Sequence, residues 1–246
     1  MTVGAIILAR SNSKRLPNKH FFEVCGKPIL YQLVKRLKKI KKIDKIILAT
    51  THDKSDFKFV KFSKKYKINI YRGHKTNCLL RVYTVAKLYK LKTIIFITGD
   101  CPIIDIKLTK KILDIYFDEK VDYVGNTFVR SYPDGMDVQV LSFSLLKKNY
   151  QNTISQLEKE HVTLGIKKNQ KKYKLINIKA PINLYWPKLG LTLDVYEDYL
   201  LLKKIIEYFY KKRKYFFNCE DVIKLLKNRV NWVKMNCKVK RLSNYL

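Results

Sequence analysis

The amino-terminal segment predicts a buried strand that runs straight into a cationic loop. Residues Val3 to Ala9 are continuously apolar, which is typical of a strand covered on both faces of a parallel sheet. Ligands of open α/β sheets bind beyond the carboxyl ends of such strands. The ten residues that follow carry four cations and two hydroxyls: Arg10, Ser11, Ser13, Lys14, Arg15 and Lys19.

These side chains suit a polyphosphate, because each phosphate oxygen needs a charge-assisted donor and each negative charge a counter-charge. The loop has neither the spaced glycines of a dinucleotide fingerprint nor the Gly-Lys-Ser/Thr ending of a P-loop. It is therefore either a phosphate loop of another type or an exposed basic loop.

Apolar and amphipathic segments alternate along the chain. We predict strands at 45–50, 68–71, 93–98 and 121–124, with helices at 29–40, 54–66, 79–88 and 108–117. Further helices are predicted at 142–150, 155–168, 195–210 and 220–226, with an edge strand at 174–179. Consecutive parallel strands need a crossover, so this order predicts a mainly parallel sheet. We expect a single domain over 1–230 and a basic tail over 231–246.

Charge is the unusual property of the composition. The chain has 52 Lys and Arg against 20 Asp and Glu, a formal net charge of +32, which favours anionic partners. The lysines are scattered over almost every predicted helix, so we expect no specific nucleic-acid partner.

Five cysteines without C-x-x-C spacing indicate a reducing compartment. With no signal-like start and no apolar run long enough to cross a bilayer, we expect a cytoplasmic protein without membrane insertion.

Two aspartates that follow apolar segments are candidate metal ligands. Asp100 comes after the most strand-like segment of the chain, beside Gly99. Mg²⁺ bridging nucleotide phosphates is usually held at such a position, because that ion prefers hard oxygen ligands. The alternative for Asp100 is a turn residue. Asp194 precedes a long predicted helix and is either its cap, a second metal ligand, or both.

Other polar residues are predicted at the same edge of the sheet. Arg72 follows the third strand and would contact a base or a phosphate, or lie on the surface. Asn126 follows the fifth strand. The run from Tyr132 to Asp137 is rich in hydrogen-bonding side chains, as a polyol pocket would be, although a β-hairpin turn accounts for its Pro-Asp-Gly equally well. The helix predicted at 155–168 includes Glu158, Glu160 and His161, a local acidic spot in a basic chain. The alternative for His161 is a partly buried structural histidine.

Taken in order, these segments resemble the sugar-nucleotide cytidylyltransferases. The likeness is greatest to the acylneuraminate cytidylyltransferase-like branch of spore-coat polysaccharide biosynthesis. The matching stretches are 7–19, 26–30, 98–105, 126–127, 132–137, 160–163, 193–194 and 197–198. The resemblance implies a Rossmann-like, three-layer α/β/α nucleotidyltransferase fold with a mainly parallel mixed sheet. It also implies transfer of CMP from CTP to an acidic or phosphorylated sugar, with release of pyrophosphate, in surface polysaccharide biosynthesis.

The same resemblance implies roles for single residues. The nucleotide would be bound by Ala9, Arg10, Ser11, Ser13, Arg15, Lys19, Arg72 and Asp100. The catalytic set would be Arg15, Lys19, Asp100 and Asp194, with Mg²⁺ held by the two aspartates. The sugar would be bound by Asn126, Tyr132, Asp134, Asp137, Glu160 and His161. Residues 126–185 would form the sugar side and the contact of a homodimer. Asp194, or a water on its metal, would be the base if the nucleophile is a sugar hydroxyl.

Two segments depart from the family pattern. After Gly73 the branch usually carries acidic residues, where this chain has 74–78 with the sequence His-Lys-Thr-Asn-Cys, so the identity of the base stays open. The tail from Asn231 matches no segment of the family. Two alternatives remain: a nucleotide-sugar-dependent glycosyltransferase of related fold, and a basic nucleic-acid-binding protein with a continuous cationic stripe.

Overall fold

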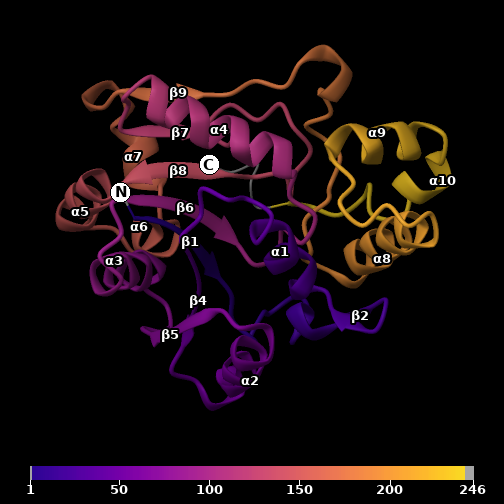
Figure 1. Ribbon diagram of the computed structural model, residues 1–246, viewed down its shortest axis with the longest axis horizontal. Helices are drawn as coiled ribbons and strands as arrows, with labels where there is room; N and C mark the ends of the chain where they lie inside the picture. The colour runs from indigo at the N-terminus through magenta and orange to yellow at the C-terminus, as the bar shows by residue number, and fades with distance from the viewer. Residues whose placement is uncertain (1, 242–246) are drawn as a thin grey trace.

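A central mixed sheet organises the molecule. The computed structural model describes residues 2–241, and within them the strands follow the order β5-β4-β1-β6-β8-β7-β9 (Figure 1). Their bounds are β1 Val3–Leu8, β4 Lys45–Thr51, β5 Asn69–Gly73, β6 Thr93–Thr98, β7 Tyr123–Gly125, β8 Gln139–Ser142 and β9 Leu175–Asn177. Of these described strands, β8 alone is antiparallel to its neighbours. The predicted α/β fold with a mainly parallel mixed sheet is confirmed.

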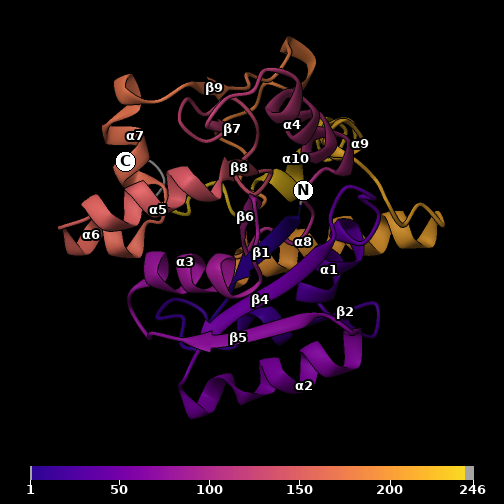
Figure 2. The same ribbon diagram turned by 60° about the vertical axis from the view of Figure 1, so that its left-hand side comes forward.

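Helices cover both faces of this sheet. Figure 2 shows α3, α5 and α6 on one side and α1, α4 and α8 on the other. The helices are α1 Leu30–Leu37, α2 Phe57–Tyr66, α3 Cys78–Leu88, α4 Ile106–Asp118, α5 Phe143–Asn152, α6 Gln156–Glu160, α7 Leu164–Lys168, α8 Tyr196–Lys211, α9 Cys219–Lys227 and α10 Val230–Val233. A short hairpin of β2 Glu23–Val24 and β3 Lys27–Pro28 precedes α1.

The opening strand shows why an unbroken apolar run was needed. Ala5 and Ile7 belong to the core beneath α1, α4 and α8, whereas Ile6 belongs to the separate core beneath α3 and α5. All three side chains are 0 % exposed. Successive side chains of a strand point to opposite faces, so a strand in the middle of three layers must be apolar at every position.

Some boundaries differ from the predicted ones. The helix expected at 155–168 is two short helices, because His161 ends α6 in an extended conformation and α7 begins only at Leu164. The first residues of the tail predicted at 231–246 belong to α10, and residues 242–246 lie outside the described range. Among residues 2–241, no helix is both long enough and apolar enough to span a bilayer.

Candidate active site

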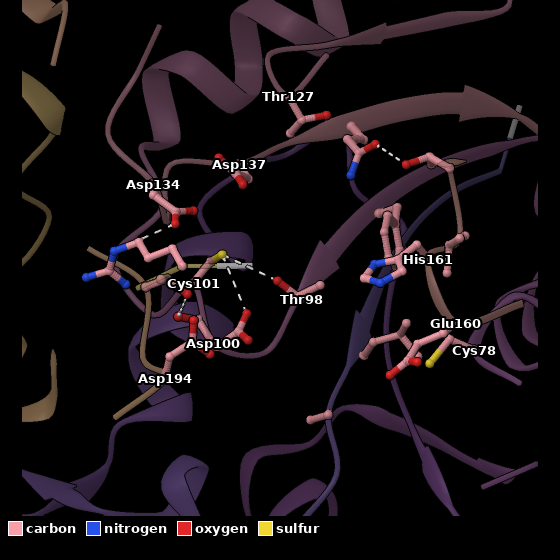
Figure 3. Close-up of a pocket in the computed structure, with 18 of the residues that line it drawn as sticks. Cys78, Thr98, Asp100, Cys101, Thr127, Asp134, Asp137, Glu160, His161 and Asp194 are labelled. Atoms are coloured by element: carbon pink, nitrogen blue, oxygen red, sulfur yellow. Dashed lines mark hydrogen bonds and ion pairs between the residues drawn. The ribbon is translucent and has the colours of Figure 1, made fainter. Parts of the chain in front are cut away.

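A cavity of about 650 Å³ lies beyond the carboxyl ends of β1 and β6. Figure 3 shows Asp100, Asp134 and Asp194 gathered in one part of it, and Cys78, Glu160 and His161 in another. The predicted site residues that line it are Ala9, Arg10, Ser13, Arg15, Lys19, Asp100, Asp134, Asp137, Glu160, His161 and Asp194. The cavity therefore lies where an open α/β sheet binds its ligands.

Lys19 lies between two carboxylates in this cavity. Its Nζ is 3.1 Å from Asp100 Oδ2 and 3.1 Å from Asp194 Oδ1. Arg15 Nη2 is 2.9 Å from the same Asp194 oxygen. Asp194 is therefore an ion-pair partner and does not cap α8: the N-cap residue is Val195, and Asp198 accepts the backbone N–H groups of Asp194 and Val195 just before the helix. The structure brings together the four residues predicted to be catalytic, and their roles stay a prediction.

Electrostatics keep this cluster charged. Burial alone would lower the pKa of Lys19, but attraction to Asp100 and Asp194 outweighs burial and raises it. Burial alone would raise the pKa of Asp100, but the Lys19 ammonium and the Thr98 hydroxyl hold it down to about 2. Both groups are therefore ionised at neutral pH, and the ammonium is held in place by two fixed partners.

The two aspartates fit Mg²⁺ as part of a larger ligand set. Their carboxylate oxygens are the hard donors that this ion prefers, and both face the same cation, Lys19. Within residues 2–241, no group of three or more His, Cys, Asp or Glu side chains is arranged to hold a metal ion. Phosphate oxygens and water would have to supply the other ligands, which is how proteins usually bind Mg²⁺.

The cationic loop is anchored by Asp56, a residue that the sequence did not single out. Asp56 Oδ1 accepts the backbone N–H of Ser11 at 2.6 Å, and Oδ2 accepts hydrogen bonds from Thr50 and Thr51. The Ser11 hydroxyl donates to the carbonyl of Ser55, and the residue is 1 % exposed. The Ser11 side chain therefore holds the loop in this structure, and its predicted contact with the nucleotide stays a prediction.

Arg72 also lies outside the cavity lining. Its guanidinium donates to the carbonyl oxygens of Thr51, His52 and Asp53, at 2.7–3.1 Å. These donors are occupied by backbone carbonyls, and the predicted contact of Arg72 with a base or phosphate stays a prediction. The arginine connects the end of β5 to the end of β4 and the residues after it, where three carbonyl oxygens accept hydrogen bonds from its guanidinium.

Two predicted sugar-binding residues are structural. Asn126 is 1 % exposed, donates to the carbonyl of Met136 and accepts the N–H of Val138, so it joins the end of β7 to the approach to β8. Tyr132 is 4 % exposed and belongs to the apolar core. Neither residue lines the cavity, because Asn126 is hydrogen-bonded to the backbone and Tyr132 packs in the core, and a role of either in sugar binding stays a prediction.

We call the part of the cavity lined by Arg130, Asp134, Asp137, Thr192 and Arg241 the acidic end. Arg130 binds Asp137 through two hydrogen bonds of 2.9 Å, and its Nη1 lies 3.3 Å from Asp134 Oδ1. Burial and the neighbouring Asp137 raise the pKa of Asp134 to about 6, against the opposing effect of Arg130 and Arg241.

We expect Asp137→Asn to lower the pKa of Asp134, because it removes a negative charge and leaves Arg130 to the remaining carboxylate. A pH titration of the labelled Asp134 carboxyl carbon by NMR measures this shift, with the exposed Asp118→Asn as control. A raised carboxyl pKa stabilises the native state at acid pH, and that contribution is lost as pH rises through about 6. An unchanged titration in Asp137→Asn would show that the two carboxylates do not interact.

The other part of the cavity contains a buried arginine that the sequence analysis did not include. Arg81, on α3, is 2 % exposed, and its Nε and Nη1 have no hydrogen-bond partner within residues 2–241. Its Nη2 contacts Cys78 Sγ at 3.2 Å, and burial is the main cause that lowers the pKa of the guanidinium. The sequence contains one signal that Arg81 is buried. It stands next to Val82 and one turn before Val85, on the buried face of α3. A buried guanidinium with two nitrogens lacking a partner among the described residues favours an anionic or carbonyl-bearing ligand.

Comparison with known proteins finds relatives of this chain. Residues 4–232 match the sequence model of a family described as cytidylyltransferase. The chain is 34% identical over 209 residues to an uncharacterised protein of Methanocaldococcus jannaschii, with 85% of each chain covered. It is 30% identical over 209 residues to the spore coat polysaccharide biosynthesis protein SpsF of Bacillus subtilis, covering 82% of this chain and 85% of that protein.

A solved structure is similar over nearly the whole chain. It is described as a cytidylyltransferase from Leptospira borgpetersenii and superposes with a TM-score of 0.91 at 30% sequence identity. The match covers 98% of this chain and 100% of the other.

Proposed function

Since this chain belongs to the cytidylyltransferase family, we propose that it transfers CMP from CTP to an acidic or phosphorylated sugar, releasing pyrophosphate, in surface polysaccharide biosynthesis. The observation that carries this proposal is the meeting of Arg15 and Lys19 with Asp100 and Asp194 in one cavity. A nucleotide needs cations for its phosphates, and a divalent ion needs the carboxylates. The same cavity offers both.

The proposed reaction needs the protein mainly to position the substrates and to supply counter-charge. Attack of a sugar oxygen on the α-phosphorus builds negative charge on the phosphoryl oxygens and on the departing pyrophosphate. Arg15 and Lys19 would stabilise that charge, and Arg10 and Ser13 would bind the remaining phosphate oxygens. Mg²⁺, held by Asp100 and Asp194, would supply further counter-charge when bound. A preorganised donor of this kind contributes about 3–4 kcal/mol to lowering the barrier.

The two parts of the cavity would take different portions of the substrates. Arg81 would face the nucleotide, since its unpaired N–H groups suit phosphate or carbonyl oxygens. The acidic end would take the sugar. A sugar hydroxyl needs a proton acceptor and a phosphate nucleophile does not, so Asp194 would act as base only in the first case.

Pyrophosphate release tests the proposal directly. Each nucleoside triphosphate is incubated with Mg²⁺ and a panel of sialic-type, ulosonic and phosphorylated sugars. We expect pyrophosphate with CTP and at least one sugar. Transfer or hydrolysis from a nucleotide sugar, without pyrophosphate from any pair, would contradict the proposal and favour a glycosyltransferase.

The homodimer expected over 126–185 stays a prediction, and light scattering tests it. Several large apolar side chains of that region are exposed: Val129, Ile154, Leu157, Ile182 and Tyr185. The five cysteines of the chain are all free thiols, as a cytoplasmic enzyme with access to CTP would have.

A further inference from the structure

The segment beyond the family match contributes a side chain to the cavity. The match ends at residue 232, whereas Arg241 lines the cavity together with Thr192 and Asp194. The Arg241 side chain is only 9% exposed. Residues that the sequence presented as a basic tail therefore form part of the wall of the candidate active site.

A buried carboxylate holds this arginine in place. Asp198 is 0 % exposed, and its Oδ1 accepts from Arg241 Nη2 at 2.8 Å and from Asn236 Nδ2 at 2.7 Å. Its Oδ2 accepts the backbone N–H groups of Asp194 at 2.9 Å and of Val195 at 3.1 Å. One side chain thus joins the C-terminal segment to the backbone of a candidate catalytic aspartate.

Gly190 fixes the position of the guanidinium from a second side. Asn236 Nδ2 donates to the Gly190 carbonyl at 3.0 Å. A Cβ atom at Gly190 would lie 1.8 Å from Arg241 Nη2, so the guanidinium packs directly against the glycine backbone. A methyl group at this position would displace the guanidinium from its present place.

The distance between Arg241 and Asp134 suits a bridging hydroxyl. Arg241 Nε lies 4.0 Å from Asp134 Oδ2, which is beyond the about 2.7–3.2 Å of a good hydrogen bond. A hydroxyl oxygen can accept from the guanidinium and donate to the carboxylate. Around this point the three carboxylates of Asp134, Asp137 and Asp198 outnumber the two guanidiniums. That balance disfavours an oxyanion and suits a neutral hydroxyl.

We propose that Arg241 binds a hydroxyl group of the sugar acceptor, shared with Asp134, and thereby makes the C-terminal segment part of the acceptor site. The identification of the ligand as a sugar rests on the proposed function. The acidic or phosphate group of the acceptor would be bound outside the acidic end, nearer the cations of the opening loop.

Sugar binding without nucleotide or metal tests this proposal. The probes are N-acetylneuraminate, 3-deoxy-D-manno-octulosonate, D-mannose 1-phosphate and methyl α-D-mannoside, titrated by saturation-transfer NMR. We expect Arg241→Ala and Gly190→Ala to weaken binding about 10- to 100-fold, the range for a hydrogen bond from a charged donor. The exposed Arg229→Ala is the matched control and should bind sugars as the wild type does. CTP affinity, measured by calorimetry, should stay within twofold in every variant, which also verifies folding.

The phosphate and methyl mannosides form a pair that separates hydroxyl recognition from oxyanion recognition. We expect Arg241→Ala to weaken both by the same factor. A loss confined to the phosphate, equal binding by Arg241→Ala and wild type, or no sugar binding by wild-type protein that binds CTP would each overturn the proposal. Failure of the proposed function would look different: Arg241-dependent sugar binding would persist while no pyrophosphate was released.

Discussion

Replacing Lys19 with alanine is expected to lower kcat for pyrophosphate release by about 10²–10³-fold, the usual effect of removing one preorganised donor from a developing negative charge. The ammonium is buried and held at 3.1 Å by each of two carboxylates, so water cannot readily replace it. The variant also leaves Asp100 and Asp194 facing each other without their shared cation. The pKa of Asp100 should then rise from about 2, because Lys19 is the strongest of the influences that lower it.

The matched control for this variant is Lys27→Ala, which removes an exposed lysine of β3. Steady-state rates at saturating CTP, with thermal unfolding to verify the fold, measure the effect. Unchanged kcat in folded Lys19→Ala would remove the lysine from the catalytic set and leave Arg15 as the remaining candidate cation.

Replacing Asp56 with alanine is expected to lower the free energy of unfolding by about 2–4 kcal/mol and to raise the KM for CTP. The carboxylate accepts the N–H of Ser11 and of Thr51 together with the hydroxyls of Thr50 and Thr51. Its loss leaves buried donors without an acceptor, at about 1–3 kcal/mol for each group that finds no substitute. Because Ser11 lies inside the cationic loop, the loop loses its anchor at the same time.

The pH dependence of the Asp56 effect has a defined sign. Burial alone would raise the pKa of Asp56, but its hydrogen bonds outweigh burial and lower it. The stabilisation is therefore present above the unfolded-state pKa of about 3.9 and is lost as pH falls through the lower native value. Urea denaturation at neutral and acid pH measures the difference, with the exposed Asp118→Ala expected to stay within about 0.5 kcal/mol of wild type. A penalty for Asp56→Ala that did not shrink on acidification would show that the carboxylate charge is not its source.

The sequence by itself determined the layered fold and the edge of the sheet at which the site lies. Strands such as Val3–Leu8 and Thr93–Thr98 can be predicted from the sequence, because a strand buried on both faces needs an unbroken apolar run. The carboxyl end of such a strand then places whatever follows it, which is how Lys19 and Asp100 could be assigned to one cavity. The apolar run and the polar residues that follow it are local properties, which a few consecutive residues of the sequence show.

Only the tertiary structure decided which polar side chains face the cavity. Ser11, Arg72 and Asn126 stand in the right segments, yet their hydrogen bonds go to the protein itself. Arg81 and Arg241 stood in a helix and a presumed tail, yet both line the cavity. The physical reason is that the partner of a polar group depends on proximity in space. Lys19 and Asp194 are 175 residues apart in the sequence, and no local sequence pattern predicts that their side chains meet.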